Sequence, residues 1–199
     1  MQYSTTPAVV FLAAFALGAC QARTKSAETA DTTEAPAAAP APTAAPQSAL
    51  ESAMSAAPKS IVDGAAIMNA PDSKTTQMTQ VRAGSNGWTC VAASATFDPM
   101  CADQNFVSLM TALMAKKDPH IKGVGFAYML HGDDIGASNT DPFATAPTAD
   151  NHWVKAPPHL MVVFPDAKAL DAFPVEPASG GPWVMWKGTK YAHLMVPVR

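Results

Sequence analysis

The chain has 199 residues, of which 48% are hydrophobic and 15% are charged, and its formal net charge is −3. These values are ordinary for a globular protein. They exclude a strongly basic surface of the kind that nucleic-acid-binding domains carry, so we expect no nucleic-acid partner.

Residues 1–19 predict a signal peptide for export. They contain no charged side chain, and an apolar run over residues 8–17 is closed by small residues. The run is shorter than the roughly 20 residues that a membrane-spanning helix needs, and its length fits the apolar region of a signal peptide.

The LGAC string at residues 17–20 resembles the lipobox of bacterial lipoproteins, in which the cysteine is acylated. By that resemblance Cys20 is the lipidation site, the membrane is reached through its acyl chains, and Gln21 favours the outer membrane. The implied location is the periplasmic side of the outer membrane. The alternative is a plain secretory signal with an incidental cysteine, which would leave the protein secreted or soluble in the periplasm.

Residues 20–58 are dominated by Ala, Pro, Thr and Ser and offer little apolar surface to bury. This composition predicts a disordered linker. The remaining residues, 59–199, are enough for a single globular domain with its own core.

The domain begins with an expected short helix over residues 60–68, followed by a hairpin over residues 76–91 whose turn is the GSNG string. The clearest helix runs from Asp103, a good N-cap, to about Lys117. Its apolar side chains recur at helical spacing and form one stripe: Phe106, Leu109, Met110, Leu113 and Met114.

The second half of the domain alternates strands with loops. Strands are expected over residues 123–130 and 159–164, a polar loop over 131–158, and a short helix over 166–173. A final hairpin pairs residues 183–187 with 190–196 around a Gly188-Thr189 turn. The fold class is therefore α+β, a mainly antiparallel sheet packed against one main helix and shorter helices.

Cys90 and Cys101 are the cysteines that remain once Cys20 is assigned to lipid. In an exported chain this even pair predicts a disulfide, which would close a loop of about 12 residues and fasten the main helix to the sheet. Two alternatives stay open. Cys101 near a helix N-terminus could be a reactive thiol, although the C-x-x-C spacing is missing, and zinc would need further ligands.

The strings NGWTC, DPMC, GFAYMLHG, SNTDPFA, PHLM and YAHLMVPV follow one another from about residue 86 onward. In this order they resemble blocks of an uncharacterised family of exported bacterial proteins. The resemblance implies export but no activity, ligand or cofactor. Where similar sequences have proline before the tyrosine of the last string, this chain has Lys190, which bears only on the local turn.

The polar loop is rich in side chains with oxygen ligands, of the kind that calcium prefers: Asp133, Asp134, Asn139, Asp141 and Asp150. Their spacing does not match an EF-hand, and the neighbouring Gly, Ser and Pro favour solvated turns instead. General acid/base work by the adjacent Asp133 and Asp134 is disfavoured, because neighbouring side chains on an extended chain point apart.

A short repeat suggests a metal site. PHLMV at residues 158–162 and AHLMV at residues 192–196 each place a histidine two residues before a methionine, so on a strand both side chains leave from one face. Imidazole and thioether groups together are copper(I) ligands. If the two strands are neighbours, His159, Met161, His193 and Met195 form one site. The alternative is that both strings are ordinary core strands.

No G-x-S-x-G, H-E-x-x-H or G-x-G-x-x-G motif occurs, so neither a catalytic residue nor a cofactor is predicted. The leading expectation is a lipid-anchored envelope protein that acts as a non-enzymatic binding or structural module, with an unidentified protein or small-molecule partner. The alternatives are a periplasmic copper(I)-binding protein and an unrecognised enzyme.

Overall fold

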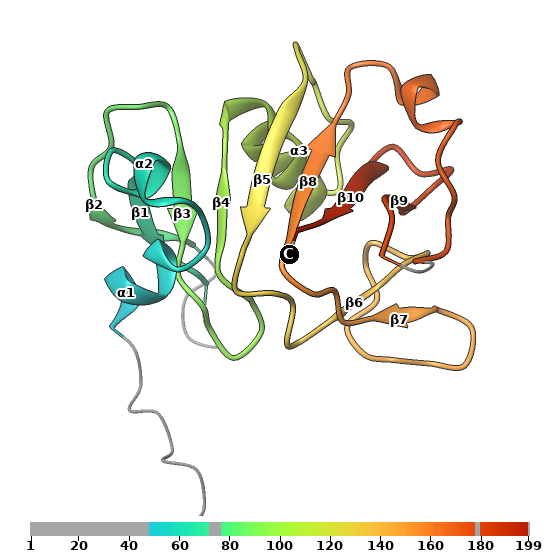
Figure 1. The fold of residues 1–199 in the computed structure, drawn as a ribbon, viewed down its shortest axis with the longest axis horizontal. Helices are drawn as coiled ribbons and strands as arrows, with labels where there is room; N and C mark the ends of the chain where they lie inside the picture. Colours follow the sequence, from blue (N-terminus) through green and yellow to red (C-terminus); the bar gives the residue numbers. More distant parts are fainter. Residues whose placement is uncertain (1–47, 72–76, 178–179, 199) are drawn as a thin grey trace, which may run out of the picture. The chain divides into compact units, whose positions relative to one another are not determined.

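The computed structural model describes residues 48–71, 77–177 and 180–198 (Figure 1). The expected signal peptide, Cys20 and most of the expected linker lie outside these residues. The helical elements are α1 (Ala49–Met54), α2 (Lys59–Val62), α3 (Gln104–Met114) and the 3₁₀ turn η1 (Ala167–Leu170). The strands are β1 (Ala66–Asn69), β2 (Thr79–Arg82), β3 (Thr89–Val91), β4 (Met100–Ala102), β5 (Gly125–Met129), β6 (Ala137–Ser138), β7 (Trp153–Val154), β8 (His159–Val163), β9 (Trp183–Met185) and β10 (His193–Pro197).

Eight strands form one sheet in the order β2-β1-β3-β4-β5-β8-β10-β9, and β6 and β7 form a separate two-stranded sheet. The structure is therefore mostly sheet with a few short helices, which agrees with the α+β class. The sheet is mixed, because β1 and β3 run parallel while its other neighbouring strands are antiparallel.

Two expectations for the first part of the domain are wrong. Residues 66–69 are a strand instead of the end of a helix, and β1 lies between β2 and β3, so the hairpin expected over residues 76–91 does not form. Ile67 is fully buried in this strand. Burial in the sheet outweighs a helical spacing that rested on only a few residues.

Helix α1 lies inside the range 20–58 for which the sequence predicts a linker. Ser48 and Glu51 form a capping box at its start, and Ala53 has no exposed surface. Ala53 packs with Ile67 and Cys90 in the core on this side of the sheet. The folded part of the chain therefore includes α1, which the sequence assigns to the linker.

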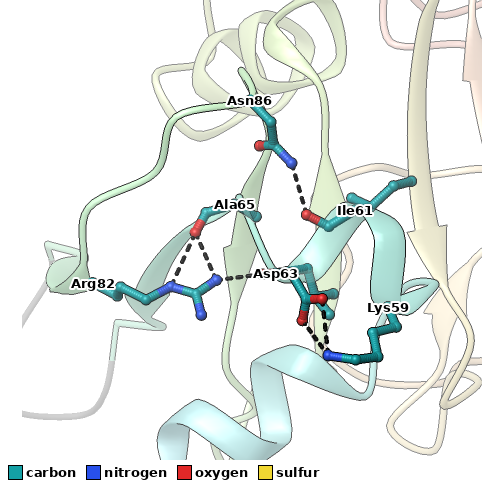
Figure 2. Close-up of polar contacts among 7 residues, drawn as sticks. Lys59, Ile61, Asp63, Ala65, Arg82 and Asn86 are labelled. Atoms are coloured by element: carbon teal, nitrogen blue, oxygen red, sulfur yellow. Dashed lines mark hydrogen bonds and ion pairs between the residues drawn. The ribbon is translucent and has the colours of Figure 1, made fainter.

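The end of α2 is held by side chains that follow it in the sequence (Figure 2). The guanidinium group of Arg82 donates hydrogen bonds to the carbonyls of Val62 and Ala65. Asn86 Nδ2 donates to the carbonyl of Ile61 at 2.7 Å. These bonds give additional partners to carbonyl groups at and just after the end of the short helix, and they fix β2 and the loop after it against α2.

The predicted disulfide is confirmed. Cys90 and Cys101 face each other directly across β3 and β4, with their sulfur atoms 2.01 Å apart. The bond joins two neighbouring strands instead of a helix and the sheet. Both side chains are buried on the face that packs against α1 and α2.

Helix α3 covers the opposite face, over β4, β5 and β8. It begins where expected, because the Asp103 carboxylate accepts a hydrogen bond from the Phe106 N–H at 2.9 Å. The other Asp103 oxygen accepts from the Phe126 N–H, which ties the start of the helix to β5. A Cβ at Gly125 would lie 2.7 Å from the Phe106 nitrogen, so glycine allows the helix to approach the strand this closely.

The last hairpin forms, but the two-residue turn expected at Gly188-Thr189 is wrong. His193 pairs with Met185, so the connection spans residues 186–192. Trp186 leaves the strand ladder with a positive φ of 58°, and its N–H donates to the carbonyl of Asn139 at 2.9 Å. Its indole N–H donates to the Ser138 carbonyl. Trp186 therefore bonds to the segment before β7 and does not pair with a strand residue of the hairpin.

Candidate functional site

The two HLMV strings form neighbouring antiparallel strands, β8 and β10, in which Met195 lies directly opposite Met161. Because alternate residues share a face, the histidines and methionines of both strings lie on the same face of the sheet, toward α3. His159, Met161, His193 and Met195 all line one cavity of about 160 Å³. The structure thus brings the four predicted residues together, while metal binding by them stays a prediction.

The cavity wall is rich in sulfur. Six of the chain's 11 methionines line it: Met100, Met110, Met129, Met161, Met185 and Met195. Each histidine has one methionine two residues later on its own strand. A second methionine lies directly opposite it on the strand that flanks the β8–β10 pair, which is β5 for His159 and β9 for His193. Met129 of β5 pairs with His159, and Met185 of β9 pairs with His193. The sequence did not reveal Met129 and Met185, because strand pairing is not visible in it.

Both imidazoles are held in one orientation by a backbone carbonyl. The Nδ1 of His159 lies 2.7 Å from the Pro157 oxygen, and the Nδ1 of His193 lies 3.0 Å from the Tyr191 oxygen. A carbonyl oxygen only accepts, so each Nδ1 carries a proton and each neutral ring presents an Nε2 lone pair. Metal-binding histidines in proteins are typically oriented by such a bond from the other ring nitrogen.

Neither Nε2 atom has a hydrogen-bond partner among the described residues. The two residues are 0% and 2% exposed, respectively. Burial lowers the pKa of His159, and it lowers the pKa of His193 to about 4, where the nearby His159 adds to the effect. At neutral pH both rings are therefore uncharged and able to bind a metal ion.

Aromatic side chains close the inner end of the cavity. The Trp186 ring meets the His193 ring edge-on at a centroid distance of 4.9 Å, and the Phe106 ring does so at 5.7 Å. The hydrogen bond from the Trp186 indole to the Ser138 carbonyl fixes that ring in place. Apart from the Tyr191 carbonyl, the contacts described for the His193 ring are therefore aromatic.

Two carboxyl groups stand at the outer end. Thr96 and Ile135 are the exposed residues of the lining, so the mouth lies between the loop before β4 and the loop after β5. Asp98 and Asp133 line the cavity at these loops and are hydrogen-bonded to each other. Burial, followed by this hydrogen bond to Asp98, raises the pKa of Asp133 to about 7. The Asp133 carboxyl group is therefore partly protonated near neutral pH.

The polar loop behaves mainly as a set of turns. Asp133 accepts a hydrogen bond from the Gly136 N–H, and Asp141 accepts one from the Phe143 N–H, as in Asx turns. Asn139 is buried, and its Nδ2 donates to the Val175 carbonyl. Asp134 instead lies 3.5 Å from His131, and its neighbour Asp133 pairs with the distant Asp98.

The described residues contain no group of three or more His, Cys, Asp and Glu side chains that could hold a metal ion. The calcium alternative for Asp133, Asp134, Asn139, Asp141 and Asp150 therefore has no support in this part of the chain. The disulfide also removes Cys90 and Cys101 as free thiols or zinc ligands. What remains is a cavity with thioether and imidazole donors, a soft ligand set.

Within the described ranges, no helix is both long and apolar enough to cross a membrane. Comparison with protein-family models, with curated proteins and with solved structures finds no match for this chain.

Proposed function

We propose that this protein binds copper(I) in the cavity between its sheet and α3. The observation that carries the proposal is the pair of buried Nε2 atoms, which face a methionine-lined cavity without a hydrogen-bond partner in the described residues. A buried polar atom without a partner costs about 1–3 kcal/mol. Bound copper(I) would supply the partner that each imidazole lacks.

The donor set favours copper(I) over other metals. Thioether sulfur and neutral imidazole are soft or intermediate ligands and suit a soft monovalent ion. Calcium and magnesium need oxygen ligands, and the carboxyl groups of the lining stand only at its mouth. A purely structural methionine core explains the sulfur atoms but leaves both imidazole nitrogens unexplained.

Titration with copper(I) against a chromophoric chelator, under anaerobic conditions, tests the proposal. The purified protein is expected to withdraw copper(I) from the chelator. A Met161→Leu/Met195→Leu variant is expected to bind roughly 100-fold more weakly, a loss of about 3 kcal/mol. Leucine keeps the volume of methionine, so the variant should fold while lacking both central sulfur atoms.

A second variant tests the histidines. His159→Ala/His193→Ala should also lose copper(I), whereas His120→Ala, which alters an exposed histidine outside the cavity, should bind like the wild type. Circular dichroism of each variant checks that it is folded. If the wild-type protein competes no better than the folded variants, the cavity is an apolar core and the copper proposal is wrong.

We further propose that the domain is anchored to the envelope through acylated Cys20, on the periplasmic side of the outer membrane. The support is the LGAC string after an apolar run and the disulfide, which suits an oxidising compartment. Copper(I) binding outside the cytoplasm would serve to hold or pass on the ion.

Replacing Cys20 with serine tests the anchor. We expect the wild-type protein in the membrane fraction and the Cys20→Ser variant in the soluble periplasmic or uncleaved precursor fraction, because acyl chains supply the membrane affinity. Mass spectrometry of the wild-type N-terminal peptide should show the acyl modification. Equal membrane association of the two proteins, or an unmodified peptide, would contradict the proposal.

A further inference from the structure

The positions of the two histidines in the strand register bear on how many ions the cavity holds. His159 pairs with Pro197, which lies four residues after His193 on β10. At about 3.3 Å per residue, the two histidines are about 13 Å apart along the strands, with the Met161–Met195 pair between them. One ion bound at about 2 Å from each Nε2 bridges this separation only if both rings extend toward each other along the strands.

The orientations of the two imidazole rings also favour two separate ions. Each Nδ1 bonds to the carbonyl two residues before its own histidine, on the side away from the methionine two residues after it. Because the strands are antiparallel, these tethers hold the two rings at opposite ends of the strand pair. Each end repeats one set of donors, an Nε2 with two methionines.

We infer that the cavity has two copper(I) positions, an outer one at His159 and an inner one at His193. This inference rests on the proposed copper(I) binding. It adds the number of ions bound and the path by which an ion reaches the inner position. The outer donors are His159, Met129 and Met161. The inner donors are His193, Met185 and Met195, beside the Trp186 ring.

The carboxyl pair marks the outer position as the entrance. Asp98 accepts a hydrogen bond from the Ile135 N–H at 3.0 Å, and Asp133 accepts one from the Gly136 N–H at 2.7 Å. These bonds fix both carboxyl groups at the mouth of the cavity. The mouth lies on the same side as His159, because the charge of Asp98 acts on the pKa of the His159 imidazole.

The pair carries negative charge at the mouth, which raises the local concentration of a cation. The unpartnered Nε2 of His159, a fully buried residue, is the first strong donor behind it. An ion that reaches the inner position from the mouth passes Met161 and Met195, which lie directly opposite each other on the two strands and both line the cavity. Charge at the mouth therefore governs the rate of loading, and the soft donors govern retention.

Stoichiometry is the first test. Anaerobic titration should show two equivalents of copper(I) bound by the wild-type protein and one by each of the variants His159→Ala and His193→Ala. If the wild type binds one equivalent and either substitution removes it, the proposed function stands and the two-position inference is overturned. If no protein binds copper(I), the proposed function itself fails.

The rate of loading is the second test. In stopped-flow transfer of copper(I) from a weak chelator, an Asp98→Asn/Asp133→Asn variant should load roughly tenfold more slowly than wild type and still reach two equivalents. Asparagine keeps the oxygen that accepts the backbone N–H, so the loops should keep their positions. Asp134→Asn is the matched control. It also removes one carboxylate charge next to Asp133, but the Asp134 carboxylate lies beside His131 and does not line the cavity.

Equal rates for the wild type and the Asp98→Asn/Asp133→Asn variant would overturn the entrance assignment. An equally large effect of Asp134→Asn would also overturn it, because general surface charge would then explain the rate.

Discussion

A Cys90→Ala/Cys101→Ala variant is expected to lose about 3 kcal/mol of its free energy of unfolding. The disulfide closes a loop with a sequence separation of 11 residues, and in the chain-entropy model a loop of this size contributes about 3 kcal/mol by restricting the unfolded chain. For a domain of roughly 150 residues this corresponds to a decrease in Tm of roughly 10 °C. Alanine is chosen because both side chains are fully buried, and a serine hydroxyl would lack a partner there.

Thermal unfolding of the variant, with the reduced wild-type protein as the matched comparison, measures the effect. Both should unfold at about the same temperature, because both lack the same covalent bond. The disulfide lies on the face that packs against α1, away from the methionine cavity, so copper(I) binding by the folded variant should be unchanged. Stoichiometric alkylation of both thiols in the unfolded, unreduced wild-type protein would contradict the disulfide.

Acid is expected to destabilise the fold through His193. The pKa of this residue is about 4 in the folded protein, compared with 6.5 for a histidine in an unfolded chain. Between these values the unfolded chain binds more protons, so the free energy of unfolding falls as pH decreases from about 6.5 to 4. The difference corresponds to about 3 kcal/mol, and the lowered pKa of His159 acts in the same direction.

Asp133 opposes this effect over the same range. Its pKa is raised from 3.8 to about 7, so the folded protein binds more protons there, and its contribution to stability is present in acid and lost as pH rises. Asp98 and Asp134 face it and add to the shift. Because Asp133 is only partly buried, solvent screening reduces its effect to on the order of 1–2 kcal/mol.

Urea denaturation of three proteins between pH 4 and pH 7 separates the two groups. Compared with the wild type, a His193→Gln variant should lose less stability in acid, because a glutamine side chain does not titrate. An Asp133→Asn variant should lose more, because the opposing carboxyl group is gone. If all three proteins show the same pH dependence, neither group has the shifted pKa on which this prediction rests.

The sequence by itself determined the features that depend on local pattern. Helix α3 could be predicted because its apolar residues recur at helical spacing and Asp103 provides the cap. Strand β8 could be predicted, and so could the fact that His159 and Met161 share a face, because side chains on a strand alternate. The Cys90–Cys101 bond followed from an even number of available cysteines in a chain for which the sequence predicts export.

The tertiary structure alone decided which segments become neighbours. The local sequence around residues 66–69 does not predict that β1 pairs in parallel with β3. The sequence around Met129 and Met185 likewise does not predict that each lies opposite a histidine. The same holds for Asp98, which meets Asp133 only because two distant loops converge at the cavity mouth. Local periodicity sets the face from which a side chain leaves its own strand. Which side chains share a cavity depends on strand order and register. Both are selected together, because the apolar faces of all the strands must be buried against the helices at the same time.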